Sequence, residues 1–320
     1  AELKANKVSL KNSDNLVLGA DSIINLNGEI ISKPKNREEA LKILANEVGV
    51  NLKNTNYSSL KKSTENKAKY LHIMNLISNF YNENLKKNYL NNEHINTFLK
   101  TKNIDTTTIE KFHLGYSEDF LGVIKFLHKK GFDDKILTDL NIFKKNSNNK
   151  IYDLYSKRII FPIKDKLNNT IGFGGRILEG IGPKYINSSE NEFFKKRSLL
   201  YNMNNLKNIK SKLDKLFLVE GYTDVISMHM KNVKNVVAAS GTALGNYQLR
   251  LINRITENIT LLFDGDSAGI NATNKTIDLA LHEGMNINIV QFPNNEDPDS
   301  LSKKLSKHDC ILNSSSITEK

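Results

Sequence analysis

Cysteine is nearly absent from this sequence, and long apolar runs are missing altogether. Cys310 is the only cysteine among the 320 residues, so the chain can form neither an intramolecular disulfide framework nor a cysteine-rich zinc finger. No apolar stretch approaches the roughly 20 residues that cross a bilayer, and the N-terminus lacks a signal-peptide pattern. We therefore expect a soluble, cytoplasmic protein with no membrane association and no zinc in this chain.

Acidic residues are the minority among the charged ones. The chain has 46 Lys and Arg against 35 Asp and Glu, a net charge of +11 and a pI near 9.3. Such a surplus favours a polyanionic partner, although it also serves simple solubility. The length allows a substantial core and two domains.

Two carboxylates follow a short apolar run near the end of the chain. Leu261 to Phe263 predict a buried strand, and Asp264 and Asp266 come after it with Gly265 between them. Extended backbone turns alternate side chains the same way, so both acids could approach one Mg²⁺ ion. The alternative is an ordinary strand-to-helix turn whose aspartate caps the next helix.

The same pattern of strand, acid and helix recurs through the last third of the chain. Glu220 directly follows the predicted strand Lys215 to Val219, and an acidic loop, Asn295 to Asp299, follows the last predicted strand. Strands joined by helices run parallel, so Glu220, Asp264 and Asp266 would share one sheet edge. Like charges gathered there repel one another unless cations neutralise them. The predicted strands are 215–219, 235–239, 259–263 and 286–291, and the predicted helices are 222–230, 248–256 and 268–283.

A β-rich section, residues 151–201, contains a predicted hairpin. Residues 159–163 and 170–173 form its strands, with a turn at 165–169. Pro162 cannot donate a ladder hydrogen bond, so it favours an edge strand. We interpret this section as the basic half of the site.

Basic residues accompany that hairpin. Arg158 and Arg176 bracket its open end, and guanidinium groups suit bidentate recognition of phosphate. Gly174 and Gly175 would let a nucleotide approach the backbone closely. A second cluster suits single-stranded nucleic acid, because cations neutralise phosphates and aromatic rings stack on bases; the alternative is a solvated charge run over core aromatics. It comprises Lys184, Lys195, Lys196 and Arg197, interleaved with Tyr185, Phe193, Phe194 and Tyr201.

Several motifs occur in one order along the chain. They are Arg-Ile-Ile-Phe-Pro-Ile-Lys-Asp at 158–165, Ile-Gly-Phe-Gly-Gly-Arg at 171–176, Pro-Lys-Tyr-Ile-Asn-Ser at 183–188, Glu-Gly-Tyr-Thr-Asp-Val at 220–225, Ala-Ser-Gly-Thr-Ala-Leu at 239–244, Leu-Phe-Asp-Gly-Asp-Ser-Ala-Gly at 262–269 and Glu-Asp-Pro-Asp-Ser at 296–300. Together they resemble the polymerase core of bacterial DnaG-type primases, with its Toprim domain. The resemblance covers roughly Arg37 to Leu305.

The resemblance implies an α/β fold, in which a parallel Toprim sheet flanked by helices follows a mixed α+β basic subdomain. It implies a nucleotidyltransferase that copies single-stranded DNA into short RNA primers from NTPs, using two Mg²⁺ or Mn²⁺ ions. Glu220 would be a metal ligand or the general acid/base, beside catalytic Asp264 and Asp266. The remaining implied roles are metal binding by Asp264, Asp266, Asp297 and Asp299, nucleotide binding by Arg158, Arg176 and Lys184, and DNA binding by Lys195, Lys196 and Arg197.

The expected organisation has four parts. Residues 1–36 are unassigned apart from a hairpin around Asn27-Gly28; 37–205 form the basic subdomain, 206–305 the Toprim domain and 306–320 a polar tail. We expect a monomer whose partners are the DNA template, NTPs, the RNA primer and a replicative helicase. The helicase-binding domain of such primases has no counterpart in this sequence.

Other classes share parts of this pattern. A Toprim topoisomerase needs a large domain with a catalytic tyrosine, for which the residues before Arg158 leave little room. A nuclease can share the Toprim site. A phosphatase with an Asp-x-Asp nucleophile would attack through Asp264, but in such enzymes the strand that carries the nucleophile is normally the first of the fold, whereas here it lies near the end of the chain. A non-catalytic nucleic-acid clamp would keep the basic cluster without needing the acids. A helicase fusion is excluded because Gly-x4-Gly-Lys-Ser/Thr does not occur.

Overall fold

The computed structural model describes residues 57–206, 213–241 and 244–290, together with three short strands nearer the N-terminus. The chain divides into two compact units, residues 1–66 and 67–320. The first contains the strands β1 (Val17–Leu18), β2 (Ile24–Leu26) and β3 (Glu29–Ile31), which form an antiparallel sheet. Leu26 lies opposite Glu29, so β2 and β3 make the predicted hairpin.

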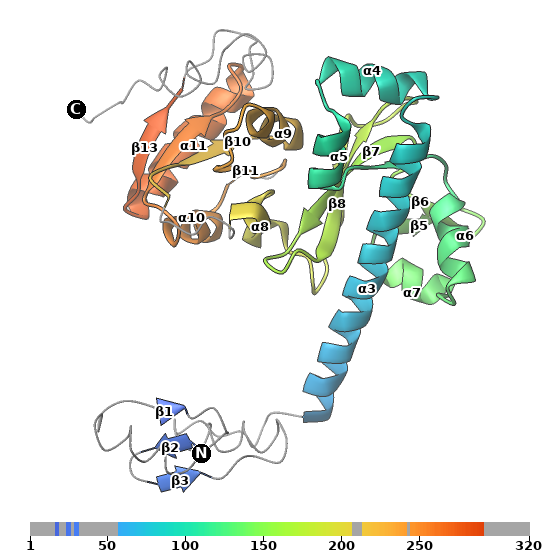
Figure 1. The fold of residues 1–320 in the computed structure, drawn as a ribbon, viewed down its shortest axis with the longest axis horizontal. Coiled ribbons are helices and arrows are strands. Elements are labelled where there is room, and N and C mark those ends of the chain that lie inside the picture. The colour runs from blue at the N-terminus through green and yellow to red at the C-terminus, as the bar shows by residue number, and fades with distance from the viewer. Residues whose placement is uncertain are drawn as a thin grey trace. The chain divides into compact units, whose positions relative to one another are not determined.

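The second unit begins with a mixed α+β region, residues 67–206, which we call the antiparallel lobe (Figure 1). Its helices are the part of α3 (Tyr57–Asn88) from Lys67 onward, α4 (Glu93–Thr101), α5 (Thr106–Phe112), α6 (Gly122–Lys129), α7 (Asp134–Asp139), η2 (Lys196–Ser198) and α8 (Met203–Leu206). Its strands are β4 (Gly115–Ser117), β5 (Phe143–Lys145), β6 (Ile151–Asp153), β7 (Arg158–Lys164), β8 (Thr170–Ile177) and β9 (Tyr185–Asn187). The main sheet has the order β4-β7-β8-β9, and β5 and β6 form a separate ribbon.

The predicted hairpin is β7 and β8, but β7 is not an edge strand as Pro162 suggested. It lies between β4 and β8. Pro162 is opposite Phe173 of β8, whereas β4 pairs only with Arg158 to Ile160. The prediction was wrong because β4 ends before it reaches the proline, so the missing N–H interrupts no ladder on that side.

Residues 213–290 form a second region, which we call the parallel lobe. Its strands are β10 (Leu216–Val219), β11 (Val236–Ala238), β12 (Asn258–Leu262) and β13 (Asn286–Ile289), and its helices are α9 (Tyr222–Met230), α10 (Asn246–Asn253) and α11 (Ser267–His282). All three strand pairs are parallel, in the order β11-β10-β12-β13. The predicted α/β fold, with a parallel sheet flanked by helices, is confirmed. None of the helices within the described residues is both long and apolar enough to cross a membrane.

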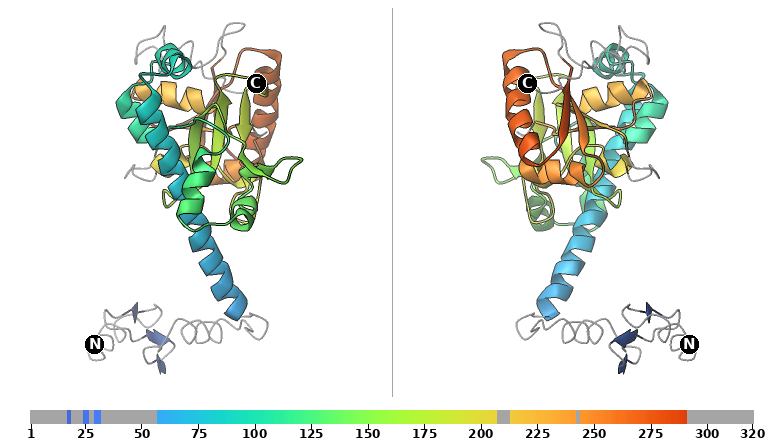
Figure 2. Two further views of the ribbon diagram at one scale, coloured as in Figure 1. Left: turned by 90° about the vertical axis from the view of Figure 1, so that its right-hand side faces the viewer. Right: turned by 90° about the vertical axis from the view of Figure 1, so that its left-hand side faces the viewer.

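Alternate residues of the strands enter different cores. In β10, Leu216 and Leu218 pack with α10 and α11, whereas Phe217 and Val219 face α9. Figure 2 shows α11 and β13 on the side of the parallel lobe that lies away from α3. Helix α9 therefore occupies the sheet face that meets the antiparallel lobe.

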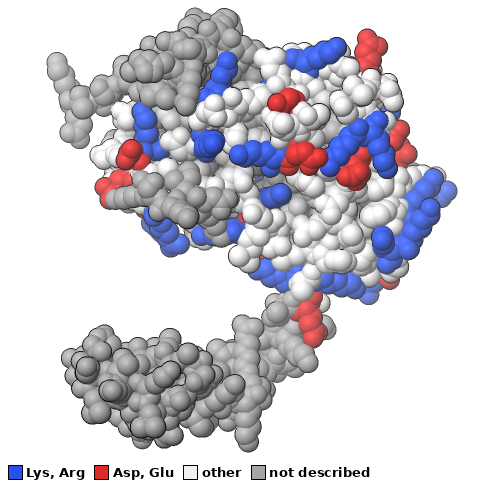
Figure 3. Space-filling model, viewed as in Figure 1, with Lys and Arg blue, Asp and Glu red and all other residues white. Residues whose placement is uncertain are grey.

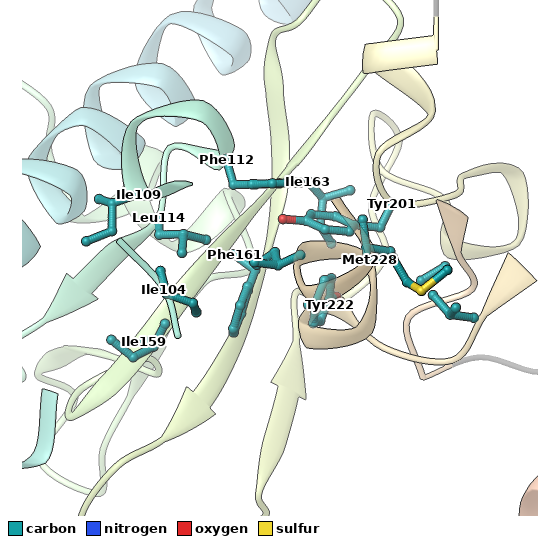
Figure 4. Packing of buried hydrophobic residues seen from close by; sticks show 14 of the residues in the cluster. Ile104, Ile109, Phe112, Leu114, Ile159, Phe161, Ile163, Tyr201, Tyr222 and Met228 are labelled. Atoms are coloured by element: carbon teal, nitrogen blue, oxygen red, sulfur yellow. The ribbon is translucent and has the colours of Figure 1, made fainter. Parts of the chain in front are cut away.

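The two lobes are joined by a shared hydrophobic core, which Figure 4 shows at close range. The ring of Tyr222 stacks on Phe161 of β7 with centroids 5.0 Å apart and an interplanar angle of 10°. Tyr201 meets Tyr222 edge-on, at a centroid distance of 4.8 Å. Because Tyr222 is only 3% exposed, it belongs to the core of both lobes.

Candidate active site between the lobes

Two of the predicted acids converge at the carboxyl edge of the parallel sheet. Val219 and Leu262 are paired in parallel, so the chain leaves both strands at the same level. Glu220 then lies near Asp264, and its Oε1 accepts a hydrogen bond from Asp264 N at 3.1 Å. The neighbouring loop is held as well, because Ser240 N donates to Glu220 O at 3.0 Å.

The environment of Glu220 favours its protonated form. The side chain is half-buried, and loss of solvation is the main cause that raises the pKa of its carboxyl. The charge of Asp266 raises this pKa further, while the hydrogen bond from Asp264 N opposes the change. A cation at this edge would reverse the effect, because it stabilises the ionised carboxylate.

Asp266 has a structural role at the start of α11. It is the N-cap of α11, and its Oδ1 accepts a hydrogen bond from Gly269 N at 2.8 Å. The alternative interpretation of the Asp264–Asp266 pair, an aspartate that caps the next helix, therefore holds for Asp266, whose side chain is exposed. Gly269 is required by packing, because a Cβ there would collide with the backbone of Asp264.

A cleft of about 280 Å³ lies beside these acids and joins the two lobes; we call it the interlobe cleft. Glu220 and Asp264 line it from the parallel lobe, and Arg176 and Lys184 line it from the antiparallel lobe. Lys102, which the sequence did not single out, lines it too. Carboxylates and cations from distant parts of the sequence thus face one volume.

Aromatic rings hold Arg176 in place. Its guanidinium carbon lies 4.8 Å from the ring centroid of Phe98 and 5.6 Å from that of Tyr185. Its Nη1 also donates to Tyr185 Oη at 3.3 Å. These contacts restrict the side chain while leaving it part of the cleft wall.

The structure does not bring Arg158 into the cleft lining. Arg158 is 6% exposed, and its Nη1 donates to Pro183 O at 2.9 Å. Burial lowers the pKa of its guanidinium, and the backbone carbonyl of Pro183 accepts a hydrogen bond from the buried group. Arg158 fixes the loop before Lys184.

The glycines beside the hairpin leave room for protein rather than for a ligand. A Cβ on Gly174 would collide with the ring of Tyr222, and a Cβ on Gly175 would lie 2.5 Å from Tyr155 Cδ1. Both glycines are needed because tyrosine rings pack against the backbone of β8. The space expected for a nucleotide at these two positions is therefore filled.

Apart from Lys184, which lines the interlobe cleft, the second basic cluster lies on the connection between the lobes. Lys195 and Arg197 are exposed around η2, and buried Gln248 donates from Nε2 to Leu199 O at 2.7 Å, which fastens this connection to α10. Lys196 lines a small pocket that shares its Asn187, Tyr222 and Ser240 walls with the interlobe cleft. Of the interleaved aromatics, Phe194 is core at 1% exposure, and Phe193 packs on Tyr70 with centroids 4.7 Å apart.

Asn187 is a positioning residue that the sequence reasoning missed. Its Nδ2 donates to Ser240 O at 2.8 Å, and its Oδ1 accepts from Tyr222 Oη at 2.6 Å. It therefore ties β9 to the loop beside Glu220. The only signal in the sequence was its place within the motif at 183–188.

The structure describes only some of the predicted metal ligands. Asp297 and Asp299 are outside the described residues. Across residues 57–206, 213–241 and 244–290, no group of three or more His, Cys, Asp or Glu is arranged to hold an ion. Glu220 and Asp264 are accordingly a partial set of hard oxygen donors, the chemistry that Mg²⁺ and Mn²⁺ prefer.

Family models match both lobes. Residues 80–207 match the N-terminal domain of the DNA primase catalytic core, and residues 217–302 match a Toprim-like domain. The parallel lobe is thus a Toprim-like domain, and the chain is a Toprim-containing protein. More narrowly, the chain belongs to the DnaG-type DNA primases and carries their catalytic core.

Relatives and solved structures support this assignment. A DNA primase of Staphylococcus aureus strain MW2 is 35% identical over 265 residues, which is 82% of this chain and 44% of the relative. The chain thus spans less than half the length of the curated relatives it matches. A DnaG primase catalytic domain bound to ssDNA superposes with a TM-score of 0.70 at 28% identity, over 78% of this chain and 81% of that one. A DNA primase domain from Pseudomonas aeruginosa gives 0.71 at 30% identity, over 76% and 77%.

Proposed function

We propose that this chain is the RNA polymerase core of a DNA primase, which copies single-stranded DNA into short RNA primers. The observation that carries this proposal is the interlobe cleft, where Glu220 and Asp264 face Arg176 and Lys184. Nucleotidyl transfer needs this combination, because carboxylates bind the metal ions and cations bind the triphosphate.

The acids at the sheet edge suit divalent metal. We infer that Glu220, Asp264 and Asp266 hold two Mg²⁺ or Mn²⁺ ions, with Asp297 and Asp299 completing the set. When bound, such ions activate the primer 3′-hydroxyl and stabilise the leaving pyrophosphate. The alternative role for Glu220 is that of the general acid/base, which would accept the proton that leaves the 3′-hydroxyl instead of binding an ion.

The cations divide between nucleotide and template. Arg176 and Lys184 would bind the phosphates of the incoming NTP, and Arg176 is already oriented by Phe98 and Tyr185. Arg158 would act on the nucleotide indirectly, by holding the loop before Lys184. The template strand would follow Lys195, Lys196 and Arg197, and the ssDNA bound to the DnaG catalytic domain supports this class of ligand. The chain would act as a monomer, with a replicative helicase as its partner.

A non-catalytic clamp is the second candidate, because the basic residues alone could bind a strand. Substitution of Asp264 by Asn separates the two functions. Extension of a preformed primer on single-stranded DNA should fall by roughly 100-fold or more, since even outer-shell changes at metal sites cost about 10–100-fold. Strand binding, measured by fluorescence anisotropy, should stay close to that of the wild type.

The matched control is Asp278→Asn, which removes an exposed carboxylate from α11 of the same lobe. It should leave extension unchanged. If the wild type binds the strand but extends no primer with either Mg²⁺ or Mn²⁺, the clamp is the better description. If Asp264→Asn extends primers at the wild-type rate, Asp264 does not hold the metal.

A further inference from the structure

A second cavity, of about 540 Å³, lies between the turn that joins α4 to α5 and the C-terminal end of α9. None of the predicted site residues lines it. Its wall includes Lys102, Lys111, Phe112, His229, Lys231 and Lys234. Lys102 also lines the interlobe cleft, so the two cavities adjoin at this side chain.

The wall of this cavity carries a surplus of positive charge. Its one carboxylate, that of Asp105, is engaged in capping α5 and accepts from Thr108 N at 2.7 Å. Within the part of the chain that the structure describes, Lys111, Lys231 and Lys234 have no ion-pair partner. Figure 3 shows that Lys and Arg also occur in several places on the face viewed there. Unneutralised lysines around a cavity attract an anion.

His229 adds a neutral donor to these cations. Its ring packs edge-on against Phe112, with centroids 5.2 Å apart. Burial, followed by the charges of Lys111 and Lys234, lowers the pKa of His229 to about 4. The imidazole is therefore neutral at pH 7, and its single ring N–H is able to donate to an anionic oxygen.

The cavity suits phosphate better than a base. Phe112 is only 5% exposed, so its ring has no free face on which a base could stack. The lysines, by contrast, provide mobile point charges that bind phosphate without reading sequence. Because Lys102 connects this cavity to the interlobe cleft, a strand in the cleft can continue into it.

We propose that this cavity binds backbone phosphates of a nucleic-acid strand that continues from the interlobe cleft past Lys102. The identity of the strand rests on the proposed function, but its binding can be measured without catalysis. The test replaces Lys231 and Lys234 together by Gln and measures binding of single-stranded DNA by fluorescence anisotropy over a salt series. Oligonucleotides of about 4 and about 16 nucleotides cover the usual range of site sizes.

For the longer oligonucleotide, the slope of log K against log salt should become shallower by about 1.4, since each single-strand phosphate contact contributes about 0.7. A shorter oligonucleotide that binds at the interlobe cleft without reaching the second cavity should bind as it does to the wild type. The matched control is the pair Lys144→Gln and Lys145→Gln, two exposed lysines of β5. The slope of log K against log salt for this control variant should equal that of the wild type. Thermal melts of each variant test whether it is folded.

Three results would overturn the proposal. An unchanged slope with the longer oligonucleotide would mean that Lys231 and Lys234 do not contact phosphates. An equal change of slope in the control pair would mean that the effect comes from net charge alone. A loss of ATP binding without a loss of strand binding assigns the cavity to free nucleotide. A wild-type protein that binds the strand but extends no primer would contradict the proposed function alone and leave this proposal standing.

Discussion

The two lobes place their charged side chains by different physical means. In the parallel lobe, Glu220 and Asp264 follow paired strands, so backbone geometry alone carries them to one edge. In the antiparallel lobe, Arg158 and Arg176 lie on neighbouring strands, but Arg176 is opposite Ile159, so the two arginines project from opposite faces of the sheet. Arg158 is buried against Pro183 O, whereas Arg176 lies over aromatic rings in the cleft. Strand topology positions the acids, whereas each cation is placed by its face of the sheet and by the side chains that pack on that face.

This difference predicts two kinds of response to substitution. Changes at the acidic edge should alter chemistry and leave the fold nearly unaffected. Changes in the packed layers of the antiparallel lobe, or in the core that joins the lobes, should alter stability first.

The largest effect is expected at Tyr222, the ring that both lobes share. Tyr222→Ala removes a buried aromatic that stacks on Phe161 and meets Tyr201, so unfolding should cost about 3–5 kcal/mol less. Tyr222→Phe keeps the ring and loses only the hydrogen bond to Asn187, at a cost of about 1 kcal/mol. Urea denaturation monitored by far-UV circular dichroism measures both values.

If the two substitutions are equally destabilising, the hydrogen bond and not the packed ring couples the lobes. A second transition that appears only in Tyr222→Ala would mean that the lobes then unfold separately. That result would sharpen the contrast, because it would give each lobe a stability of its own.

The next effect concerns a buried acid of the antiparallel lobe, Asp153. Burial raises the pKa of its carboxyl to about 6, even though Tyr81 Oη, Ser117 Oγ and Tyr155 N all donate to it. The folded state therefore binds the proton more tightly than the unfolded state. The stability that this proton contributes is complete below about pH 4 and is lost as pH rises through about 6. The difference between this pKa and the ordinary value of about 4 for an aspartate corresponds to about 3 kcal/mol.

Asp153→Asn cannot titrate, so its free energy of unfolding should vary less with pH between about 4 and 6 than that of the wild type. Chemical denaturation at a series of pH values gives the comparison. Asp133→Asn, which replaces an exposed N-cap of the same lobe, controls for the loss of one carboxylate. Parallel pH curves for the wild type and Asp153→Asn would show that the buried carboxyl does not titrate in this range.

The smallest effect on the fold is expected at Asp266, on the acidic edge. Asn caps a helix about as well as Asp, and relief of repulsion with Glu220 offsets the loss of a charge at the start of α11. The metal-free melting temperature of Asp266→Asn should therefore equal or slightly exceed that of the wild type. The rise in melting temperature that Mg²⁺ produces should shrink, because a ligand that binds only the folded state stabilises it by mass action.

Thermal melts at constant ionic strength, with and without Mg²⁺, separate the two roles of this residue. An equal Mg²⁺ response in both proteins would leave Asp266 as a helix cap and nothing more. A large loss of metal-free stability would contradict the contrast itself, since the acidic edge would then be structural.

The sequence alone determined the parallel lobe and its acidic edge. Apolar runs of strand length alternate with helical segments, and each carboxylate follows its strand immediately, so local pattern and chain connectivity suffice to place Glu220 near Asp264. The hairpin β7-β8 was also predictable, because its strands are adjacent in the sequence. These features depend on interactions that periodicity and short connections encode.

Only the tertiary structure decided which side chains reach the cleft. Register places Arg158 and Arg176 on opposite faces of the β7-β8 pair, but only the packing on each face makes one donate to Pro183 O and the other line the cleft. The same holds for Gly174, whose missing side chain makes room for Tyr222, and for Lys102, which adjoins both cavities. Each of these outcomes depends on contacts between segments far apart in the chain, and such contacts leave no periodic signal in the sequence.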